Sequence, residues 1–227
     1  MPKIIYKNNC FIDVHQRNLS NEMTTFASVN NKQVNNLFKM KKIFLLAVVA
    51  SGLAFGQSKK VVASDVHWWG YKVAKSEASS HDGTVKVKSG DMVMKGNQLV
   101  GGTFVLDMTT ITSTDLTGEY QTKLNGHLKN GDFFEVEKFP TATFKITGVK
   151  KNNDKIYSSL VTGNLTVKGK TEAISFPAKI SYSKGVVSLV SNKFTIDRQK
   201  FDVAYKSTMQ DVFVKDDIDM LVKVTAK

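Results

Sequence analysis

Apolar and polar residues alternate along most of the chain from Ser64 onward, with the period of two that half-buried β-strands show. The alternation is most regular between Ile174 and Tyr182, where every second residue is apolar. Polar and glycine-containing segments interrupt it and predict turns. These segments are 75–80, 89–91, 95–97, 150–155, 168–170 and 183–185, and the strands are expected within 64–74, 81–88, 99–114, 142–149, 156–167, 174–182, 187–196 and 212–224.

One stretch departs from this pattern. Residues 116–128 contain few β-branched residues, and Leu124 and Leu128 lie four apart, which predicts a short helix. Pro140 fixes its own backbone and disfavours the helical conformation of the residue before it, so the chain must change structure there and return to a strand. Between helix and strand lie three aromatic residues that we expect to fill the corner, namely Phe133, Phe134 and Phe139.

This order of elements predicts an all-β fold. About eight strands are joined by short turns, and they are expected to pair antiparallel because a parallel connection needs about a dozen residues or more. Such a sheet protects its edges by closing into a barrel or by folding into a sandwich. We favour an eight-stranded antiparallel barrel with one short helix, and the sandwich stays open as the alternative. Glycines at 101–102 and Gly163 are expected at bulges or bends, and Pro177 at an edge or bulge.

The first part of the chain has a different character. Residues 40–56, MKKIFLLAVVASGLAFG, combine a basic start, an apolar run and small residues flanking Phe55, which is the pattern of a cleaved secretory signal peptide. The apolar run is about half the ~20 residues that a bilayer crossing needs. Residues 1–39 are rich in Asn and lack periodicity, so we expect translation to start at Met40. A long leader and a signal anchor are the alternatives. The mature domain would be 57–227, in the periplasm.

Processing at this site would change the cysteine content and the charge. Cys10 is the only cysteine, so a mature chain would have no disulfide, no thiol nucleophile and no cysteine for a lipid anchor. The formal net charge would fall from +12 to +7, because 25 basic and 18 acidic residues remain after residue 56. We expect this surplus to be spread over strand faces as single lysines such as Lys86 and Lys145. It is compatible with a mild, transient attraction to membrane surfaces and argues against nucleic-acid binding, since no basic stripe is interleaved with aromatics.

The sequence shows no motif of an enzyme or a metal site. The histidines of the mature part, His67, His81 and His127, lie on separate predicted elements, and no spacing such as H-x-H or H-E-x-x-H joins them. An acyl-transfer site would need a nucleophile, a base and an orienting group to converge. We therefore expect no catalysis, no metal and no cofactor. We interpret Asp197 and Arg198 as a structural pair at a strand end, with phosphate recognition as the alternative.

Four segments together resemble one known family. They are GGTFVLDMTTI at 101–111, HLKNGDFFEVEKFPTATFKI at 127–146, VTGNLTVKGKT at 161–171 and FTIDRQKF at 194–201, and they keep their order and spacing over nearly all of the mature chain. In these segments the chain is similar to the YceI-like family of exported lipid-binding proteins. The resemblance implies an extended, lipocalin-like barrel, often a homodimer, whose interior holds a long apolar chain such as a polyisoprenoid, a quinone tail or a prenyl pyrophosphate.

Strand parity gives the candidate ligand-binding residues. His127 and Asp132 match the family motif and would position a polar group near the barrel mouth, although we favour helix capping for His127 and bonds to loop amides for Asp132. Large apolar residues on regular strand faces are the candidate lining, because flexible methionines and aromatic rings suit an adaptable chain. They are Trp69, Tyr71, Phe104, Leu106, Met108, Phe144, Ile146, Ile174, Phe176, Met220 and Val222.

Three functions follow as hypotheses. The leading one is non-enzymatic binding, storage or transport of a long-chain isoprenoid or similar amphiphilic lipid, driven by apolar burial. The second is a periplasmic stress-response or interaction module, which predicts a solid core and an exposed apolar patch. The third is a lipid hydrolase or isomerase, which would need a polar constellation inside the barrel.

Overall fold

The computed structural model describes residues 56–74, 77–131, 133–205, 207 and 212–227. Residues 1–55, with Cys10 and nearly all of the predicted signal peptide, lie outside the described residues, so the start site and the signal stay predictions. Residues 56–227 form one compact unit. Among the described residues, no helix is both long and apolar enough to cross a membrane.

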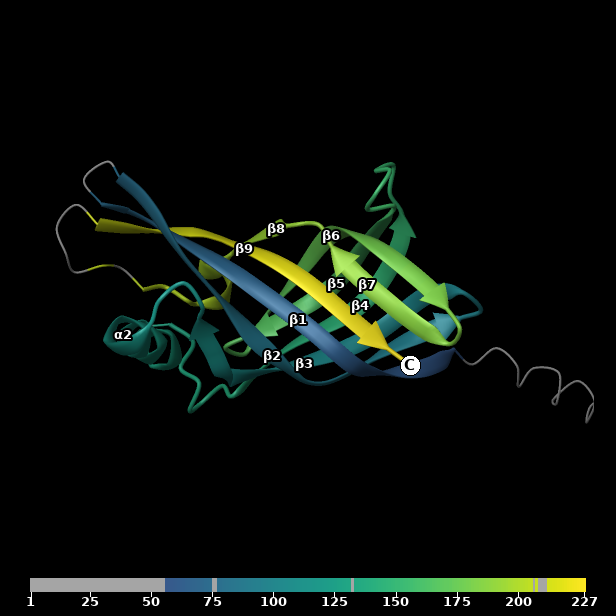
Figure 1. Ribbon diagram of the computed structural model, residues 1–227, viewed down its shortest axis with the longest axis horizontal. Helices are drawn as coiled ribbons and strands as arrows, with labels where there is room; N and C mark the ends of the chain where they lie inside the picture. The colour runs from purple at the N-terminus through teal and green to yellow at the C-terminus, as the bar shows by residue number, and fades with distance from the viewer. Residues whose placement is uncertain (1–55, 75–76, 132, 206, 208–211) are drawn as a thin grey trace, which may run out of the picture. The chain divides into compact units, whose positions relative to one another are not determined.

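The described chain folds into one antiparallel sheet that closes on itself (Figure 1). The sheet order is β1-β2-β3-β4-β5-β6-β7-β9-β8, and β1 also pairs with β9, which completes a ring of eight strands. The short β8 pairs with β9 at 217–220, beyond the segment 223–226 that pairs with β7. The predicted eight-stranded antiparallel barrel is therefore confirmed. Its elements are β1 (Gln57–Ala74), β2 (Glu77–Lys95), β3 (Gln98–Ser113), α2 (Gly118–Lys129), β4 (Thr141–Lys151), β5 (Ser159–Val167), β6 (Lys170–Ser183), β7 (Val186–Ser191), β8 (Phe194–Asp197), the 3-10 turn η2 (Arg198–Phe201) and β9 (Val212–Ala226).

Some predicted boundaries were wrong. The expected turn at 89–91 lies inside β2, which pairs with β3 at all three residues and with β1 at Asp91. Gly90 is needed for close packing and not for a turn, because a Cβ on it would lie 2.9 Å from the Phe104 ring. β2 also includes most of the polar segment 75–80, since a hairpin that extends into solvent needs no apolar face. The predicted strand 187–196 is interrupted at 192–193, where the chain passes from β7 to β8.

The structure agrees only in part with the roles predicted for Gly163 and Pro177. The β4–β5 bulge lies at Thr147 on β4, opposite the regularly paired Gly163, so the bulge was predicted on the wrong strand. Pro177 lies where β7 ends, and its carbonyl accepts a hydrogen bond of 2.8 Å from the backbone N–H of Asn192, just past the last β6–β7 pair. On the β7 side, the described strand pairing ends before Pro177, so the N–H that proline lacks breaks no hydrogen bond of the sheet.

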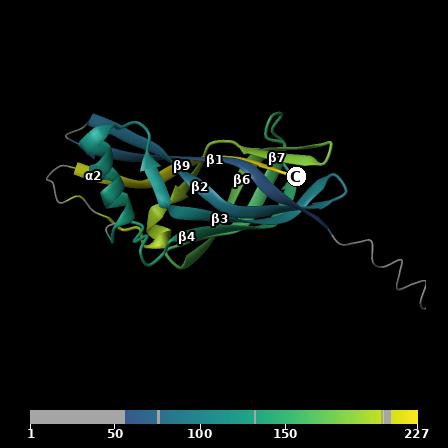
Figure 2. The same ribbon diagram turned by 60° about the horizontal axis from the view of Figure 1, so that its bottom comes forward.

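The helix α2 lies against one end of the barrel, as two views show (Figures 1 and 2). It is anchored to the end of β3 by polar side chains. The side-chain oxygen of Asn125 accepts a 2.8 Å hydrogen bond from the backbone N–H of Ser113, and the Gln121 amide donates to the Ser113 carbonyl at 2.8 Å. The observed helix is one or two residues displaced from the predicted 116–128.

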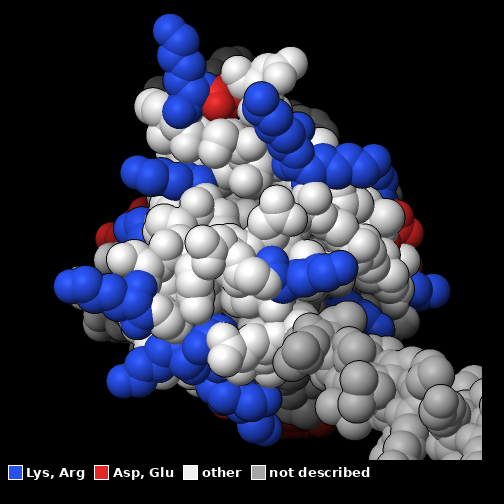
Figure 3. Space-filling model, turned by 90° about the vertical axis from the view of Figure 1, so that its right-hand side faces the viewer, with Lys and Arg blue, Asp and Glu red and all other residues white. Residues whose placement is uncertain are grey.

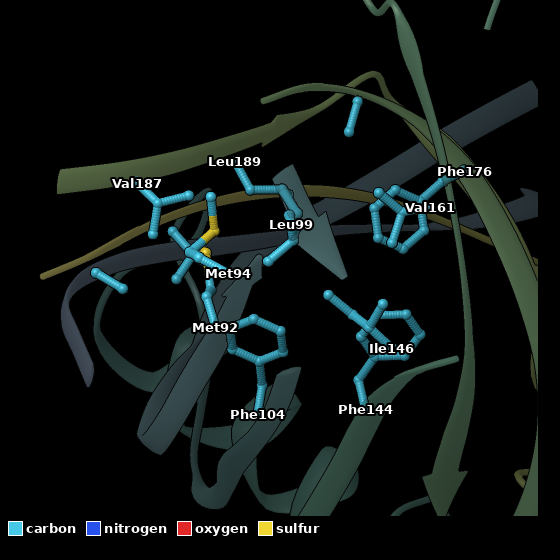
Figure 4. Close-up of a cluster of buried hydrophobic side chains, with 13 residues drawn as sticks. Met92, Met94, Leu99, Phe104, Phe144, Ile146, Val161, Phe176, Val187 and Leu189 are labelled. Carbon is cyan, nitrogen blue, oxygen red and sulfur yellow. The ribbon is translucent and has the colours of Figure 1, made fainter. Parts of the chain in front are cut away.

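Two apolar clusters occupy the barrel. The first fills the end opposite α2, where Met92 and Met94 are 0% and 1% exposed, and its side chains point toward one another from the surrounding strands (Figure 4). We call this the closed end. The second cluster lies toward α2 and includes Trp68, Met108 and Leu128. It surrounds a cavity, and we call this end the mouth.

Candidate functional site

The candidate site is an apolar cavity of about 470 Å³ inside the mouth half of the barrel. This volume lies within the range of about 300–1,000 Å³ that ligand pockets occupy. Its walls come from strands on opposite sides of the barrel, from α2 and from the segment after η2. The apolar lining includes Trp68, Val85, Leu106, Met108, Ile111, Leu124, Leu128, Phe133, Phe134, Ala142, Leu165, Val167, Phe201, Val203, Ile218 and Met220.

A smaller hollow of about 80 Å³ continues toward the closed end. Leu106, Leu165, Ile196 and Met220 line both hollows, so the two are neighbours along the barrel interior. Beyond the smaller hollow, the barrel is filled by the cluster around Met92 and therefore ends blind. The interior has the form of a tube that narrows with depth, which suits the tail of a long molecule entering from one end.

Basic and aromatic groups surround the opening. Tyr120 is 77% exposed and also lines the cavity, as do the exposed Lys123 and Lys215, so the cavity reaches solvent beside α2. His81 and His127 complete this part of the lining. Among the described residues, no Asp or Glu contributes to the cavity wall, so the opening favours a neutral or anionic group over a cation.

Arg198 reaches the cavity wall with its polar atoms already engaged. It is only 3% exposed, and its guanidinium donates to the backbone carbonyls of Val203 and Lys215 and forms an ion pair of 2.8 Å with Asp216. Asp197 does not pair with it and instead accepts a hydrogen bond from a backbone N–H of η2. The predicted Asp197–Arg198 pair was wrong. The arginine joins η2 to the start of β9, which agrees with a structural role.

Two histidine–aspartate pairs stabilise the mouth end of β1 and β2. His67 Nε2 lies 2.8 Å from Asp82, and His81 Nδ1 lies 2.8 Å from Asp115. Burial raises the pKa of Asp115, but hydrogen bonds from His81, the Ser113 hydroxyl and the Asp82 backbone N–H outweigh it and leave the pKa below its ordinary value. These polar groups hold the hairpin and the loop before α2 in place beside the opening.

The structure places most of the predicted site residues around the two hollows. Tyr71, Leu106, Met108, His127 and Met220 line the larger one, and Phe104, Phe144, Ile174, Phe176 and Val222 line the smaller one, together with Leu106 and Met220. Ile146 lies in the packed cluster of the closed end. Asp132 lies outside the described residues. That these residues contact a ligand stays a prediction.

Trp69 is not among the residues that line either hollow. Its ring stacks on His67 with centroids 4.2 Å apart, and the ammonium of Lys193 lies 4.2 Å from its ring centroid. Its neighbour Trp68 is buried in the cavity wall instead. The expected parity was wrong because the pairing of β1 with β9 shifts register between Gly70 and Lys72, which makes Tyr71 an extra residue.

Sequence reasoning missed the contribution of irregular segments to the cavity. Phe201, Val203 and Tyr205 lie outside the predicted strands, yet all three line the wall. Phe133 and Phe134, expected only as filler at the corner, also line it. The signal available in the sequence was an unusual density of aromatic residues in segments outside the strands.

The described residues offer no cluster of side chains suited to a metal ion. Among the described residues, no three His, Cys, Asp or Glu side chains gather closely enough to hold a metal ion. His67 and His81 at the mouth each contact a carboxylate. The ring centroid of His127 lies 6.2 Å from that of Tyr205. The arrangement suits a container for an apolar molecule.

Comparison with known proteins agrees with this architecture. Residues 56–226 match the family model described as the YceI-like domain. A UPF0312 protein of Pseudomonas aeruginosa (strain LESB58) is 50% identical over 54 residues, which are 24% of this chain and 27% of that protein. Protein YceI of Salmonella newport (strain SL254) is 44% identical over 54 residues, with the same coverage of 24% and 27%. The aligned stretch thus spans about a quarter of these curated relatives.

Solved structures with the same fold are more distant in sequence. BcnA of Burkholderia cenocepacia superposes with a TM-score of 0.52 at 18% identity, over 72% of this chain and 96% of that one. A polyisoprenoid binding domain from Saccharophagus degradans, implicated in plant cell wall breakdown, gives a TM-score of 0.51 at 10% identity, over 76% of this chain and 98% of that one. At these identities the likeness concerns the fold.

Proposed function

Since the family match covers residues 56–226, the chain belongs to the YceI-like family, and from this premise we propose that it binds a long-chain isoprenoid or similar amphiphilic lipid in its barrel without catalysing a reaction. The observation that carries the proposal is the blind apolar tube of about 470 Å³ and 80 Å³ under α2. The S. degradans domain of the same fold, described as polyisoprenoid binding, supports the choice of lipid class.

Apolar burial supplies the driving force for such a ligand. Each CH₂ group transferred from water to the cavity gains about 0.8 kcal/mol. The methionines of the wall, Met108 and Met220, are flexible and adapt to the branched outline of an isoprenoid chain. The ligand's polar end, for example a quinone ring or a phosphate, would lie at the mouth near His127 and Lys123.

The cellular setting belongs to the same proposal. A carrier of this kind would act in the periplasm after removal of the signal peptide at 40–56, and would store its lipid or transport it between membranes. We propose that the protein acts as a homodimer, as the family resemblance implies. No separate cofactor is required, because the lipid itself is the ligand.

The other two hypotheses fit the structure less well. An interaction module with a solid core would have no cavity, whereas the barrel contains one of about 470 Å³. A lipid hydrolase would need a nucleophile and a base that converge inside it. The described lining of the deeper hollow is entirely apolar, and in the larger cavity His81 is held by Asp115.

Mass spectrometry of the protein purified from its own host tests the proposal. Under native conditions we expect the mass of the mature chain from Gln57, alone or as a dimer, with a bound lipid that denaturing conditions release. A protein that carries no apolar molecule and binds no added prenyl lipid would overturn the proposal.

A pair of variants on β4 links binding to the cavity. Ala142 is 3% exposed and lines the cavity, so Ala142→Phe should fill space that the lipid needs and lower lipid retention at least tenfold. Thr143 is its neighbour on the same strand and is not part of either lining, so Thr143→Phe adds the same ring elsewhere and should retain the lipid. Equal retention by both variants would place the lipid outside this cavity.

A further inference from the structure

The closed end of the barrel concentrates positive charge that the strand pattern had suggested was spread out. This end comprises residues 57–60, 91–102, 146–160, 178–187 and 224–227. Neighbouring strands pair there, namely β1 with β2, β2 with β3, β4 with β5, β5 with β6, β6 with β7 and β7 with β9. These segments contain nine lysines but only two acidic residues, Asp91 and Asp154. Figure 3 shows the basic side chains arranged around this end.

The lysines of this end are free to meet an external partner. Lys60, Lys95, Lys150, Lys184 and Lys227 are all exposed. None of the ion pairs among the described residues involves a lysine of the closed end, whereas five lysine or arginine residues elsewhere on the barrel have acidic partners. Among the described residues the two local carboxylates form no ion pair with them, since Asp154 accepts backbone N–H groups and Asp91 accepts the Ser58 hydroxyl, and nine lysines against two carboxylates leave a positive surplus.

Exposed aliphatic side chains are interspersed with these lysines. Val100, Ile156 and Val186 in these segments are 44%, 63% and 38% exposed, and Val62, two residues beyond 57–60 on β1, is 53% exposed. They account for four of the six large hydrophobic side chains that are exposed among the described residues. Figure 3 shows uncharged surface between the basic side chains of this end. Cationic chains around small apolar contacts are the composition of a surface that adsorbs to a lipid interface.

We propose that the closed end docks on the surface of an anionic phospholipid bilayer. Lysine ammonium groups are attracted to the negative surface potential of such a bilayer, and each exposed aliphatic side chain gains by entering the headgroup region. The charge is carried by lysine alone, which acts as a point charge and lacks the fork of arginine that recognises single phosphates in nucleic acids. Among the described residues, the two exposed aromatic side chains, Tyr120 and Phe213, lie toward the mouth, and Tyr157 and Tyr182 at the closed end are only half-exposed, which disfavours base stacking there.

Docking in this way would orient the molecule. The cavity opens beside α2, at the opposite end of the barrel, so its mouth would face away from the bilayer that holds the closed end (Figures 1 and 2). The meaning of this orientation rests on the proposed lipid-binding function: the barrel would present its ligand to an acceptor facing that membrane. The docking itself does not require a ligand in the cavity.

Sedimentation with vesicles tests the docking. We expect the purified protein to bind vesicles of phosphatidylcholine with about one third phosphatidylglycerol at least tenfold more tightly than vesicles of phosphatidylcholine alone, and to dissociate as salt is added, since screening shortens the reach of exposed charges. The triple variant Lys95→Glu, Lys150→Glu, Lys184→Glu changes three separate parts of the closed end and should lose this binding.

A matched control changes the same charge elsewhere. Lys86, Lys145 and Lys200 are exposed and lie outside the closed end, so their triple change to Glu should leave at least half of the affinity. Equal loss in both triple variants would overturn the proposal in favour of a response to net charge. Binding to soluble DNA or heparin without binding to anionic vesicles would overturn it in favour of a polyanionic polymer.

The same samples separate this proposal from the lipid-binding function. Lipid extracted from the closed-end variant should match that from the unchanged protein, because none of its three lysines lines either hollow. Loss of vesicle binding with the bound lipid retained supports docking by this surface. Vesicle binding that persists in this variant overturns docking by this surface and leaves the lipid-binding function untouched.

Discussion

Trp68 and Trp69 show how far a single position decides the role of a residue. The two are chemically identical neighbours, yet Trp68 is 7% exposed in the cavity wall, while Trp69 stacks on His67 outside it. The lysine beside Trp69 belongs to a polar cluster in which Lys193 and Tyr71 both contact Asp219. Burial lowers the pKa of Lys193, but hydrogen bonds with Tyr71 and Asp219 outweigh it and leave the pKa raised.

Asp115 gives the clearest prediction for a single residue. Because its pKa in the folded protein lies below the ordinary value of 3.8, it stabilises the fold above that value, and this stabilisation is lost as the pH falls through the folded pKa. We expect Asp115→Asn to lower the free energy of unfolding by about 1–2 kcal/mol at neutral pH, since three hydrogen bonds, two of them at the surface, lose their charged acceptor. The difference should shrink as the pH is lowered from 7 toward about 2, because protonation of the carboxyl in the unchanged protein removes its charge as the pH falls through the folded pKa.

Urea unfolding at the two pH values measures this effect, with Asp65→Asn as the control. The Asp65 carboxylate is exposed and forms only a surface ion pair of 3.3 Å with Lys223, so its loss should cost about 1 kcal/mol or less. A deficit of Asp115→Asn that is the same at both pH values would show that the carboxylate charge plays no part.

At the scale of elements, the β4–β5 pair explains why one glycine cannot be replaced. The Phe144 ring crosses over Gly163 on the neighbouring strand and fills the space that a side chain there would occupy. A Cβ on Gly163 would lie 2.5 Å from that ring and 2.5 Å from the Lys145 carbonyl oxygen. The close approach of the two strands below the cavity therefore depends on this glycine.

We expect Gly163→Ala to destabilise the barrel by about 1–3 kcal/mol, because ring and backbone must both move to relieve the contact. Gly148→Ala is the matched control on β4, since a Cβ there meets no atom within 4 Å. Thermal unfolding followed by circular dichroism compares the two. Equal melting temperatures would mean that the strands separate at no cost and would contradict the packing described above.

At the scale of the whole molecule, the barrel combines a packed half with a hollow half. The closed end contains side chains such as Met92 and Val187 at 0% exposure, and it is built without the cavity. The mouth half has fewer fully buried side chains and depends on α2 and η2 to complete its wall. A ligand in the hollow half would replace the missing apolar contacts and should stabilise the whole fold.

Thermal stability should therefore depend on bound lipid. A ligand present at about 100 times its dissociation constant adds about 2.7 kcal/mol to the stability of the folded state, and each kcal/mol raises the melting temperature by about 2–4 °C for a domain of this size. We expect delipidated protein to melt at a lower temperature and to recover when a prenyl lipid is added. The Ala142→Phe variant should show no such recovery, and a recovery equal to that of the unchanged protein would contradict binding in the cavity.

The sequence by itself determined the order and kind of the elements. Alternation with a period of two and short turns dictated antiparallel strands, and Pro140 marked the return to a strand at Thr141, because these are local properties of the backbone and of side-chain periodicity. Half-buried faces also follow from alternation, so most of the cavity candidates, such as Leu106 and Phe176, were found from parity alone.

Only the tertiary structure decided what depends on register and on closure. The register shift beside Tyr71 breaks the alternation that joined Trp69 to Tyr71, so parity chose Trp69 where the fold uses Trp68. Closure of β1 onto β9 brought irregular segments such as that around Phe201 into the wall. It also gathered at one pole the lysines of β1, β2, β4 and β6, of the β4–β5 and β6–β7 connections and of the residue after β9. No local pattern encodes these juxtapositions, because they join residues far apart in the chain whose proximity exists only once the sheet has closed.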